Sequence, residues 1–503
     1  MTQNRDLHPR GFTAGPGLFL SVICLVSVLA ITARSFWIDE VYSARLAQQP
    51  TPQDCWRLLT SIKGSDPQMP LYVVWIWACE KLVGSGELAL RAVNLLWFVP
   101  ALWVLVRALA GNRGLQWAVF LAAALNPFAW YYLNEARAYA MQFSTSLVLF
   151  AALCHWSQKE RSPAASERRW VFGFALAFFL LCGSSLLSVL LAGTPLLLAL
   201  LLLPPQRRSE VVGKSRLVWT SLLLALLALG LYYLWTLRSG DRATALATTG
   251  WKNLLFIGYE LLGCDGLGPG RLEIRSNGLA VFKPYAAGLA VYVGLTGSLL
   301  ALAIADLRRQ FGVKKLLGFL LAGMLPAGLI LVASVVLHFR VLGRHLAALL
   351  PVAILLIGLG LHAAWRRGPW GRALAVAFLV MYFGSALSLR FAARHEKDNY
   401  RSAAALAKTA LAAGKTVWWN ADVNAAIYYQ LPLATKGAVE KGKALWVIHA
   451  WPGMLSGAEP PELILTSRPD VFDENGVLAE FLARTHYQRI SNLPGFTGWE
   501  RPR

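Results

Sequence analysis

Cysteine is scarce in this chain, and the few cysteines are scattered. Six occur among 503 residues, with no C-x-x-C pair and no cysteine–histidine cluster, which argues against a structural zinc site and leaves any disulfide open. No phosphate-binding glycine loop, nucleotide-binding fold or internal repeat is visible. No A-x-A-type cleavage site follows the first apolar run, so we expect this run to be retained as a signal-anchor helix.

Acidic residues are also few. The chain has 48 Lys and Arg against 27 Asp and Glu, a net charge of +21. The basic residues occur in short clusters between apolar runs, where the positive-inside rule places them in membrane proteins. We therefore attribute the charge to membrane topology and expect no nucleic-acid partner.

Long apolar runs dominate the sequence instead. Hydrophobic residues make up 56% of the chain and its mean hydropathy is +0.49. Stretches such as 217–235 have about 19 residues without a charge, enough to cross a hydrocarbon core of about 30 Å. The runs are continuous rather than alternating, which excludes barrel strands. The sequence predicts an α-helical polytopic protein embedded in a lipid bilayer.

The basic clusters predict about eleven spans, with the N-terminus cytoplasmic and the C-terminus outside. The apolar piece 70–79 is too short to span and suits an interfacial helix. A long outer loop is expected over 237–284. The predicted spans are 17–36, 88–110, 115–133, 138–156, two short spans within 170–203 that meet at Gly183 and Ser184, 217–236, 285–305, 316–337, 345–364 and 371–389.

The composition changes near residue 390. An amphipathic helix pattern over 390–414 precedes two short β-type runs, 415–421 and 443–450, and a second helix over 470–485. This alternation predicts a membrane domain over 1–390 and a small extracytoplasmic α/β domain over 391–503. We expect that domain to recognise acceptors or cover the membrane part rather than to act as a separate enzyme.

Two acidic motifs are predicted to reach the same outer face. "WIDE" places Asp39 and Glu40 just after the first span, and "NEARAY" places Glu135 and Arg137 between the third and fourth. A single carboxylate pair in such a place is most often a solvated loop feature. Two motifs meeting near bilayer depth favour a binding site, in which a carboxylate acts as general base and an arginine holds an anion.

A third motif on this face is "HFRVLGRHL", which contains Arg340 and Arg344. If the stretch is helical, their i, i+4 spacing makes the two side chains project from one side. Paired guanidinium groups suit a phosphate headgroup, and ordinary contact with anionic lipid is the alternative.

The order of these motifs resembles a known family. "WIDEVYSARLA", "PLYVVWIWACEKLVGSGELALRAVNLLW", "NPFAWYYLNEARAYAMQFSTSLVLFAAL" and "VLGRHLAALLPVAILL" look like the polytopic C-type (GT-C) glycosyltransferases. The similarity is to the bacterial branch near the protein O-mannosyltransferases, which use a dolichyl-phosphate-mannose-type donor, and the lipid A aminoarabinose transferases. It covers most of residues 15–160 and is partial at 338–362 and at "KDNYRSAAALA".

The resemblance implies transfer of a sugar from a polyprenyl-phosphate donor to an extracytoplasmic glycan, lipid or protein acceptor, by inverting displacement. It implies Asp39 as catalytic base and Glu135 as a second acidic catalytic residue. It also implies a bacterial inner membrane location. Where relatives often have His-Pro-Pro or Lys-Pro, this chain has "DPQMPLYV". The substrate- or phosphate-binding residues we expect are Glu40, Asp66, Arg137, Tyr139, Arg340 and Arg344.

Other functions remain open at this point. A polysaccharide ligase or polymerase with a lipid-diphosphate donor would need similar residues. In a transporter or lipid-linked sugar flippase, Asp39 and Glu135 would couple ions or gate, and a non-catalytic scaffold would need neither. The sequence identifies no cofactor with certainty and leaves the metal requirement open; a divalent cation could be shared by Asp39 and Glu135, but two carboxylates are few ligands for one.

Overall fold

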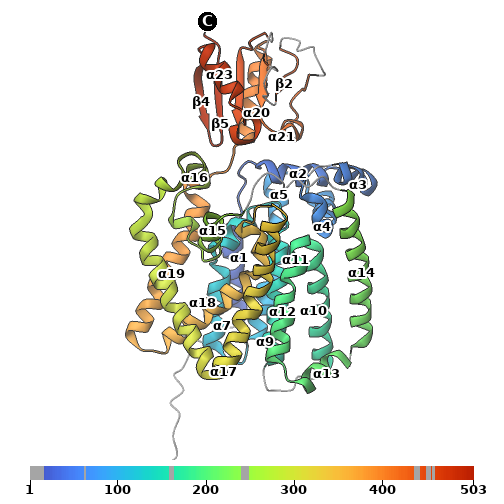
Figure 1. Cartoon of the computed structure of the whole chain (residues 1–503), viewed down its shortest axis with the longest axis vertical. Helices are drawn as coiled ribbons and strands as arrows, with labels where there is room; N and C mark the ends of the chain where they lie inside the picture. The colour runs from blue at the N-terminus through green and yellow to red at the C-terminus, as the bar shows by residue number, and fades with distance from the viewer. Residues whose placement is uncertain are drawn as a thin grey trace, which may run out of the picture.

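The computed structural model is a helical bundle with a small α/β part on one end (Figure 1). It describes residues 16–61, 64–157, 164–213, 215–239, 249–434, 442–448, 455 and 459–502. Arg5 and Arg10, from which we predicted the side of the N-terminus, lie outside these residues. So do the basic residues of 158–163 and part of the long outer loop.

The bundle is built from apolar helices. Among the described residues, five helical stretches are long and apolar enough to cross a membrane, which makes this a multi-pass membrane protein. They are Glu87–Ala108, Arg216–Arg238, Arg271–Val336, Gly343–Trp365 and Pro369–Phe391, and two shorter apolar helices are Gly17–Ala30 and Leu186–Leu202.

The helix bounds follow local sequence signals. The bundle helices are α1 (Pro16–Ala30), α5 (Glu87–Ala92), α6 (Leu95–Ala108), α7 (Arg113–Ala124), α8 (Pro127–Leu133), α9 (Tyr139–Ser157), α10 (Ala164–Ser184), α11 (Leu186–Leu191), α12 (Gly193–Leu202), α13 (Pro205–Gly213), α14 (Arg216–Ser239), α17 (Ala286–Val336), α18 (Leu350–Trp365) and α19 (Pro369–Phe391). Inside α17, Gly312 has φ 77° and separates two helices, as predicted from the basic stretch there. The predicted break at Gly183 and Ser184 is also present, because α10 ends at Ser184.

Two predicted spans were wrong in extent. The first helix ends at Ala30 rather than at residue 36, and an extended segment leads on to Trp37. The span 115–133 is two helices, α7 and α8. The side chain of Asn126 accepts a hydrogen bond from the Ala129 amide at 2.9 Å and Pro127 begins α8, a sequence that starts a new helix.

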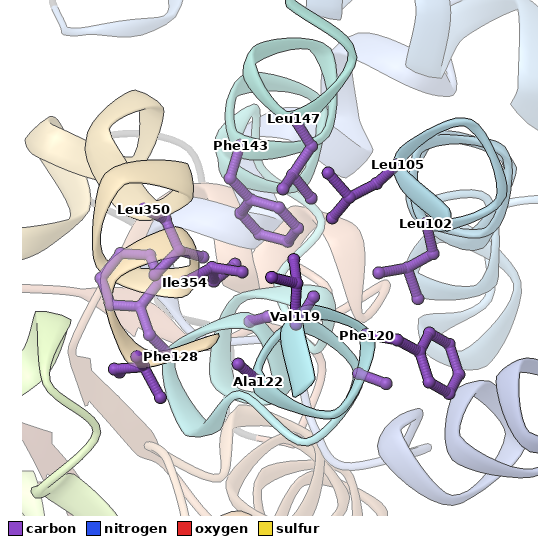
Figure 2. Packing of buried hydrophobic residues seen from close by; sticks show 14 of the residues in the cluster. Leu102, Leu105, Val119, Phe120, Ala122, Phe128, Phe143, Leu147, Leu350 and Ile354 are labelled. Carbon is purple, nitrogen blue, oxygen red and sulfur yellow. The ribbon is translucent and has the colours of Figure 1, made fainter. Parts of the chain in front are cut away.

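The core of the bundle lies where α6, α7, α8, α9 and α18 meet (Figure 2). The labelled side chains point toward one another between these helices and are all nearly inaccessible to solvent. Tight packing of this kind fixes the loops at the helix ends, and therefore the side chains they carry. The labelled core residues are Leu102, Leu105, Val119, Phe120, Ala122, Phe128, Phe143, Leu147, Leu350 and Ile354.

Short helices gather at the end of the bundle that faces the α/β part (Figure 1). Residues 70–83 form a helix of 14 residues here, in agreement with the predicted non-spanning segment. The described part of the predicted outer loop is mostly helical. The short helices at this end of the bundle are α2 (Ile38–Ala47), α3 (Pro52–Ser61), η1 (Asp66–Gln68), α4 (Pro70–Val83), α15 (Trp251–Leu261), η2 (Asp265–Leu267), α16 (Arg271–Asn277), η3 (Gly278–Tyr285) and η4 (Gly343–Leu349).

The C-terminal part is a five-stranded sheet with helices, in the order β2-β1-β3-β5-β4. β2, β1 and β3 are parallel, and β5 and β4 are antiparallel to their neighbours. The predicted α/β character is confirmed, although the sequence indicated only two of the strands. The strands are β1 (Val417–Asn420), β2 (Trp446–Val447), β3 (Leu463–Ser467), β4 (Gln488–Leu493) and β5 (Phe496–Glu500).

The helices of this part differ from the predicted ones at their bounds. The helix expected over 390–414 is shorter, because α20 (Tyr400–Ala412) begins only after the Asn399 side chain caps it. The helix expected over 470–485 is instead two helices, α22 (Pro469–Phe472) and α23 (Val477–Arg484). Gly476, which directly precedes α23, has a left-handed backbone with φ 69°. The remaining helices are η5 (Ala393–His395) and α21 (Val423–Tyr428).

The sheet domain packs directly on α2. One apolar cluster contains Phe36 and Val41 from the α2 region together with Tyr400 and Trp419 from the α/β part. Polar contacts surround it: Tyr42 donates to Asp422 at 3.2 Å, and Tyr429 donates to Glu87 at 2.9 Å. The first acidic motif is therefore enclosed by both parts of the chain.

Candidate active site

Asp39 and Glu40 occupy the first turn of α2, where carboxylates interact favourably with the helix dipole. Consecutive residues on a helix point about 100° apart, so the two side chains meet different surroundings. The Asp39 side chain is 28% exposed, whereas that of Glu40 is 0% exposed. Of the two, only Asp39 is accessible to a substrate.

Glu40 is held inside the protein by Arg91 of α5. Arg91 donates to both carboxylate oxygens of Glu40 at 2.8 Å, and Glu40 also accepts from the Ala136 amide at 2.9 Å. Burial alone would raise the pKa of Glu40, but the charges of Arg91 and Lys397 and these hydrogen bonds keep its pKa below the usual value. Glu40 thus ties α2, α5 and the "NEARAY" loop together.

Glu135 pairs with Lys397, which comes from the segment between α19 and α20. The Lys397 ammonium group lies 3.0 Å from Glu135 Oε1 and 3.8 Å from Glu40 Oε2. Burial lowers the pKa of Lys397, and the charges of Glu135 and Glu40 oppose this shift. The other oxygen of Glu135, Oε2, is buried and has no hydrogen-bond partner among the described residues.

Arg137 forms a second buried ion pair, with Asp66 of η1, at 2.5 Å. It also donates to the Asp39 carbonyl at 3.2 Å and to the hydroxyls of Ser43 and Ser65. Burial raises the pKa of Asp66, and the charge of Arg137 works against that rise. Arg137 therefore positions the first turn of α2 rather than facing open space.

Asp39 itself contacts Arg344. The Arg344 guanidinium donates to Asp39 Oδ2 at 3.0 Å and lies over the rings of Trp37 (5.4 Å) and Tyr139 (5.9 Å). These contacts fix one carboxylate oxygen of Asp39, and no cation among the described residues forms an ion pair with its other oxygen. The predicted helical spacing of Arg340 and Arg344 is absent, because 337–342 is not α-helical and η4 starts at Gly343.

A cavity of about 320 Å³ opens beside this pair. Arg340 and Arg344 both line it, although they do not share a helix face. Aromatic side chains form one part of the wall, and charged groups from four regions of the chain, 260–275, 340–344, 396–398 and 468–470, form much of the rest. The lining residues that matter below are Trp37, Tyr131, Tyr132, Glu260, Arg271, Arg275, Arg340, Arg344, Glu396, Lys397, Asp398, Arg468 and Asp470.

Arg271 is the deepest cation supplied by the predicted outer loop. It contacts Glu260, lies 3.5 Å from Asp265 and stacks 4.0 Å from the centre of the Tyr131 ring. Its Nε atom, like that of Arg344, is buried and has no hydrogen-bond partner among the described residues. Two such donors at one cavity suit an anionic ligand.

The structure brings Arg340 and Arg344 to the cavity; Asp39 and Tyr139 contact Arg344 but are not among the lining residues. It places Glu40, Asp66 and Arg137 in buried ion pairs behind it, and Glu135 against Lys397. Sequence reasoning missed Arg91, Lys397 and Arg271. Arg91 had a usable signal, since an arginine within the apolar run "ELALRAVNLLW" is costly unless it is paired. Lys397 had none, because its partner Glu135 is distant in sequence. Arg271 pairs with Glu260 and Asp265, which are near in sequence but lie on other elements, so no spacing indicated the contact.

The carboxylates do not fit a divalent cation. Within the ranges that the structure describes, no group of three or more His, Cys, Asp or Glu side chains could hold a metal ion. Asp39 and Glu135 instead face the cations Arg344 and Lys397. We derive no step through a metal.

Comparison with solved structures identifies the fold of the chain. No protein-family model and no curated protein sequence matches the chain. ArnT from Cupriavidus metallidurans in the apo state superposes with a TM-score of 0.57 at 13% identity, over 97% of this chain and 97% of that one. The same protein bound to undecaprenyl phosphate gives 0.55 at 14% identity, over 97% and 98%. The arabinofuranosyltransferase AftD from Mycobacteria gives 0.45 at 15% identity, over 97% and 40%. The chain therefore has the GT-C fold.

Proposed function

We propose that the chain is a membrane glycosyltransferase that moves a sugar from a polyprenyl-phosphate donor to an extracytoplasmic acceptor. The observation that carries the proposal is Asp39, an accessible carboxylate fixed by Arg344 at the edge of a cationic cavity. The GT-C fold supports it, as does the undecaprenyl phosphate bound by the structural neighbour.

In the proposed reaction, Asp39 removes the proton from an acceptor hydroxyl or amine as that atom attacks the anomeric carbon. The bond from that carbon to the phosphate oxygen breaks, and the polyprenyl phosphate leaves. Arg344 and Arg271, which both line the cavity, stabilise the charge on the departing phosphate. A single displacement inverts the anomeric configuration.

The acceptor side is proposed to be extracytoplasmic. α13, which carries Arg207 and Arg208, lies at the end of the bundle remote from the α/β part (Figure 1). Basic loops stay in the cytoplasm, so this arrangement supports a bacterial inner membrane orientation with the domain of 391–503 outside. The choice between a mannosyl-type and an aminoarabinose-type donor belongs to the same proposal and rests on the sequence resemblance alone.

The test compares membranes that carry wild type, Asp39→Asn or Glu480→Gln, with mass spectrometry of lipid-linked sugars and glycans. Loss of a general base lowers a rate by about 10² to 10⁴-fold, so Asp39→Asn should lose the glycan and accumulate polyprenyl-phosphate sugar. Glu480, whose side chain is 72% exposed on α23, is the control and should behave as wild type.

Each result separates the alternatives. If Asp39→Asn makes every glycan that the wild type makes, the base assignment is wrong. Accumulation of a lipid-diphosphate sugar instead of a monophosphate would favour the ligase or polymerase. A wild type that moves the lipid-linked sugar across the bilayer without transferring it would favour the flippase.

A further inference from the structure

Three arginines that line the cavity have no role in the proposed reaction. Arg275 comes from α16, Arg340 from the segment before η4, and Arg468 from the end of β3. They lie far apart in sequence, and all three line the same cavity as Arg344. The cavity thus extends from the Asp39–Arg344 pair to a separate group of cations.

The charges of this group are only partly balanced. Arg275 lies 3.4 Å from Asp398, and Arg468 makes two hydrogen bonds to Asp470, at 2.9 and 2.8 Å. None of the described carboxylates forms an ion pair with Arg340. The whole lining has six Lys or Arg and four Asp or Glu, and Asp39 and Glu135 neutralise Arg344 and Lys397 from just outside it. Among the described residues, Arg340 is therefore the lining cation left without an ion pair.

The three guanidinium groups are close enough to act on one another. Burial, then the charges of Arg344 and Arg468, lower the pKa of Arg340, and Arg275 adds to this, while Asp470 opposes it. Like charges held together in this way cost free energy that an anion between them would recover.

The α/β domain places Arg468 at the edge of its sheet where α/β folds bind ligands. Arg468 directly follows β3, at the carboxyl end of a parallel strand, and open α/β sheets bind ligands outside these ends. Its backbone has φ 45°, a left-handed conformation that non-glycine residues rarely adopt. The domain therefore holds Arg468 over the cavity in a constrained geometry.

We infer that Arg275, Arg340 and Arg468 form a second anion subsite, which binds a phosphate or carboxylate group of the acceptor. The inference rests on the proposed function, which assigns the donor phosphate to Arg344 and Arg271. An acceptor bound here would span from the arginine group to Asp39, with its anionic group against the α/β domain. The α/β domain would then select acceptors that carry a negative charge.

The experiment measures binding of inorganic phosphate to the full-length protein in nanodiscs saturated with undecaprenyl phosphate. Wild type should bind one further phosphate, and Arg340→Gln should weaken this binding by about tenfold or more, the loss of one charge-assisted contact. Arg340→Lys should keep much of it. Arg484→Gln, on the same domain with a side chain 69% exposed, should bind as wild type does.

Three outcomes would overturn the inference. Phosphate that competes with undecaprenyl phosphate would place both anions in one site. Equal binding by Arg340→Gln and wild type would remove Arg340 from it. If undecaprenyl diphosphate displaces the added phosphate and the monophosphate does not, the subsite belongs to the second phosphate of a diphosphate donor. Failure of undecaprenyl phosphate to bind would instead count against the proposed function, while Arg340-dependent phosphate binding would still support the subsite.

Discussion

Glu40 and Asp39 are neighbours in very different surroundings, and Arg91 accounts for those of Glu40. Arg91, whose side chain is 1% exposed, donates to Glu40 and to the backbone carbonyls of Thr32, Arg34 and Ser35. It therefore fixes the extended segment that leads from α1 to α2. Glu40 is thus held in a buried ion pair, and Asp39, which is 28% exposed, is the carboxylate that we propose as the base.

Removing Arg91 should be costly for stability. Arg91→Met leaves the Glu40 carboxylate buried without its main counter-charge and leaves three carbonyls without donors. Breaking one side of a buried ion pair costs about 3 to 5 kcal/mol, so we expect the free energy of unfolding, measured by denaturation in detergent, to fall by that amount. Arg57→Met is the control: this side chain is 80% exposed, and its loss should change stability by at most about 0.5 kcal/mol. Equal effects of the two variants would contradict the structural role.

Asp265 should make stability depend on pH. Burial, then the charge of Glu260, raise its pKa to about 7, and Arg271 opposes the rise. The folded protein then binds a proton more tightly than the unfolded chain, whose carboxyl titrates near 4. Stability contributed by this group is present below about pH 4 and is lost as pH rises to about 7, by at most about 1.4 kcal/mol per pH unit.

The Asp265→Asn variant isolates this contribution. Its melting temperature relative to wild type should increase from pH 4 to 7 and then level off, because asparagine cannot be ionised. Parallel melting profiles over that range would show that Asp265 does not titrate there. Glu273→Gln, a carboxylate on the neighbouring α16, serves as the control for the general effect of charge.

At the scale of elements, the site depends on how closely η2 approaches α19. A Cβ added at Gly266 would lie 1.9 Å from the Ser385 carbonyl oxygen of α19, which is backbone and cannot rotate away. The Gly266 amide also donates a hydrogen bond to the Ser385 hydroxyl at 3.1 Å, which holds η2 against α19. Only glycine allows this contact, which places Asp265 beside Arg271, a residue of the cavity lining.

We therefore expect Gly266→Ala to push η2 away from α19 and to weaken binding of undecaprenyl phosphate through displacement of Arg271. Gly258→Ala in α15 is the matched control, because nothing lies within 4 Å of its added Cβ. In a helix that change is neutral or stabilising by up to about 1 kcal/mol. Lipid binding and melting temperature of both variants check this, and a Gly266→Ala protein with wild-type affinity would contradict it.

The sequence was sufficient for elements whose signal is local. Continuous apolar runs predicted the bundle, and "WIDE" and "NEARAY" were correctly expected to lie near each other, because Glu40 accepts from the Ala136 amide. The sequence was insufficient where tertiary contacts determine the burial of a side chain or the position of a strand. No local pattern separates the buried Glu40 from the accessible Asp39, and β4 and β5 lack the apolar alternation that marks a strand. The catalytic and binding roles of these residues, and the domain division at about 390, stay predictions.

At the scale of the whole molecule, the cavity joins two parts of the chain that no single element connects. Trp37 and Arg344 belong to the bundle, whereas Lys397, Asp398 and Arg468 belong to the C-terminal part. A ligand that contacts both parts binds only their docked arrangement, so it stabilises docking by mass action. At a ligand concentration 100 times the dissociation constant, this is about 2.7 kcal/mol.

Phosphate bound at the arginine subsite should therefore protect the segment between α19 and α20, which follows Phe391 (59% exposed) and from which Lys397 reaches Glu135. The subsite joins the two parts, because Arg340 precedes η4 whereas Arg468 follows β3. If the segment is cut only when the domain undocks, saturating phosphate should slow proteolysis or amide exchange there by about 100-fold, the equivalent of that free energy. Asp39→Asn should keep the protection, because Asp39 is not part of the subsite, and Arg340→Gln should lose most of it. Protection that is absent in wild type, or unchanged in Arg340→Gln, would mean that the anion does not bridge the two parts, and the α/β domain would then cover the site without binding the ligand.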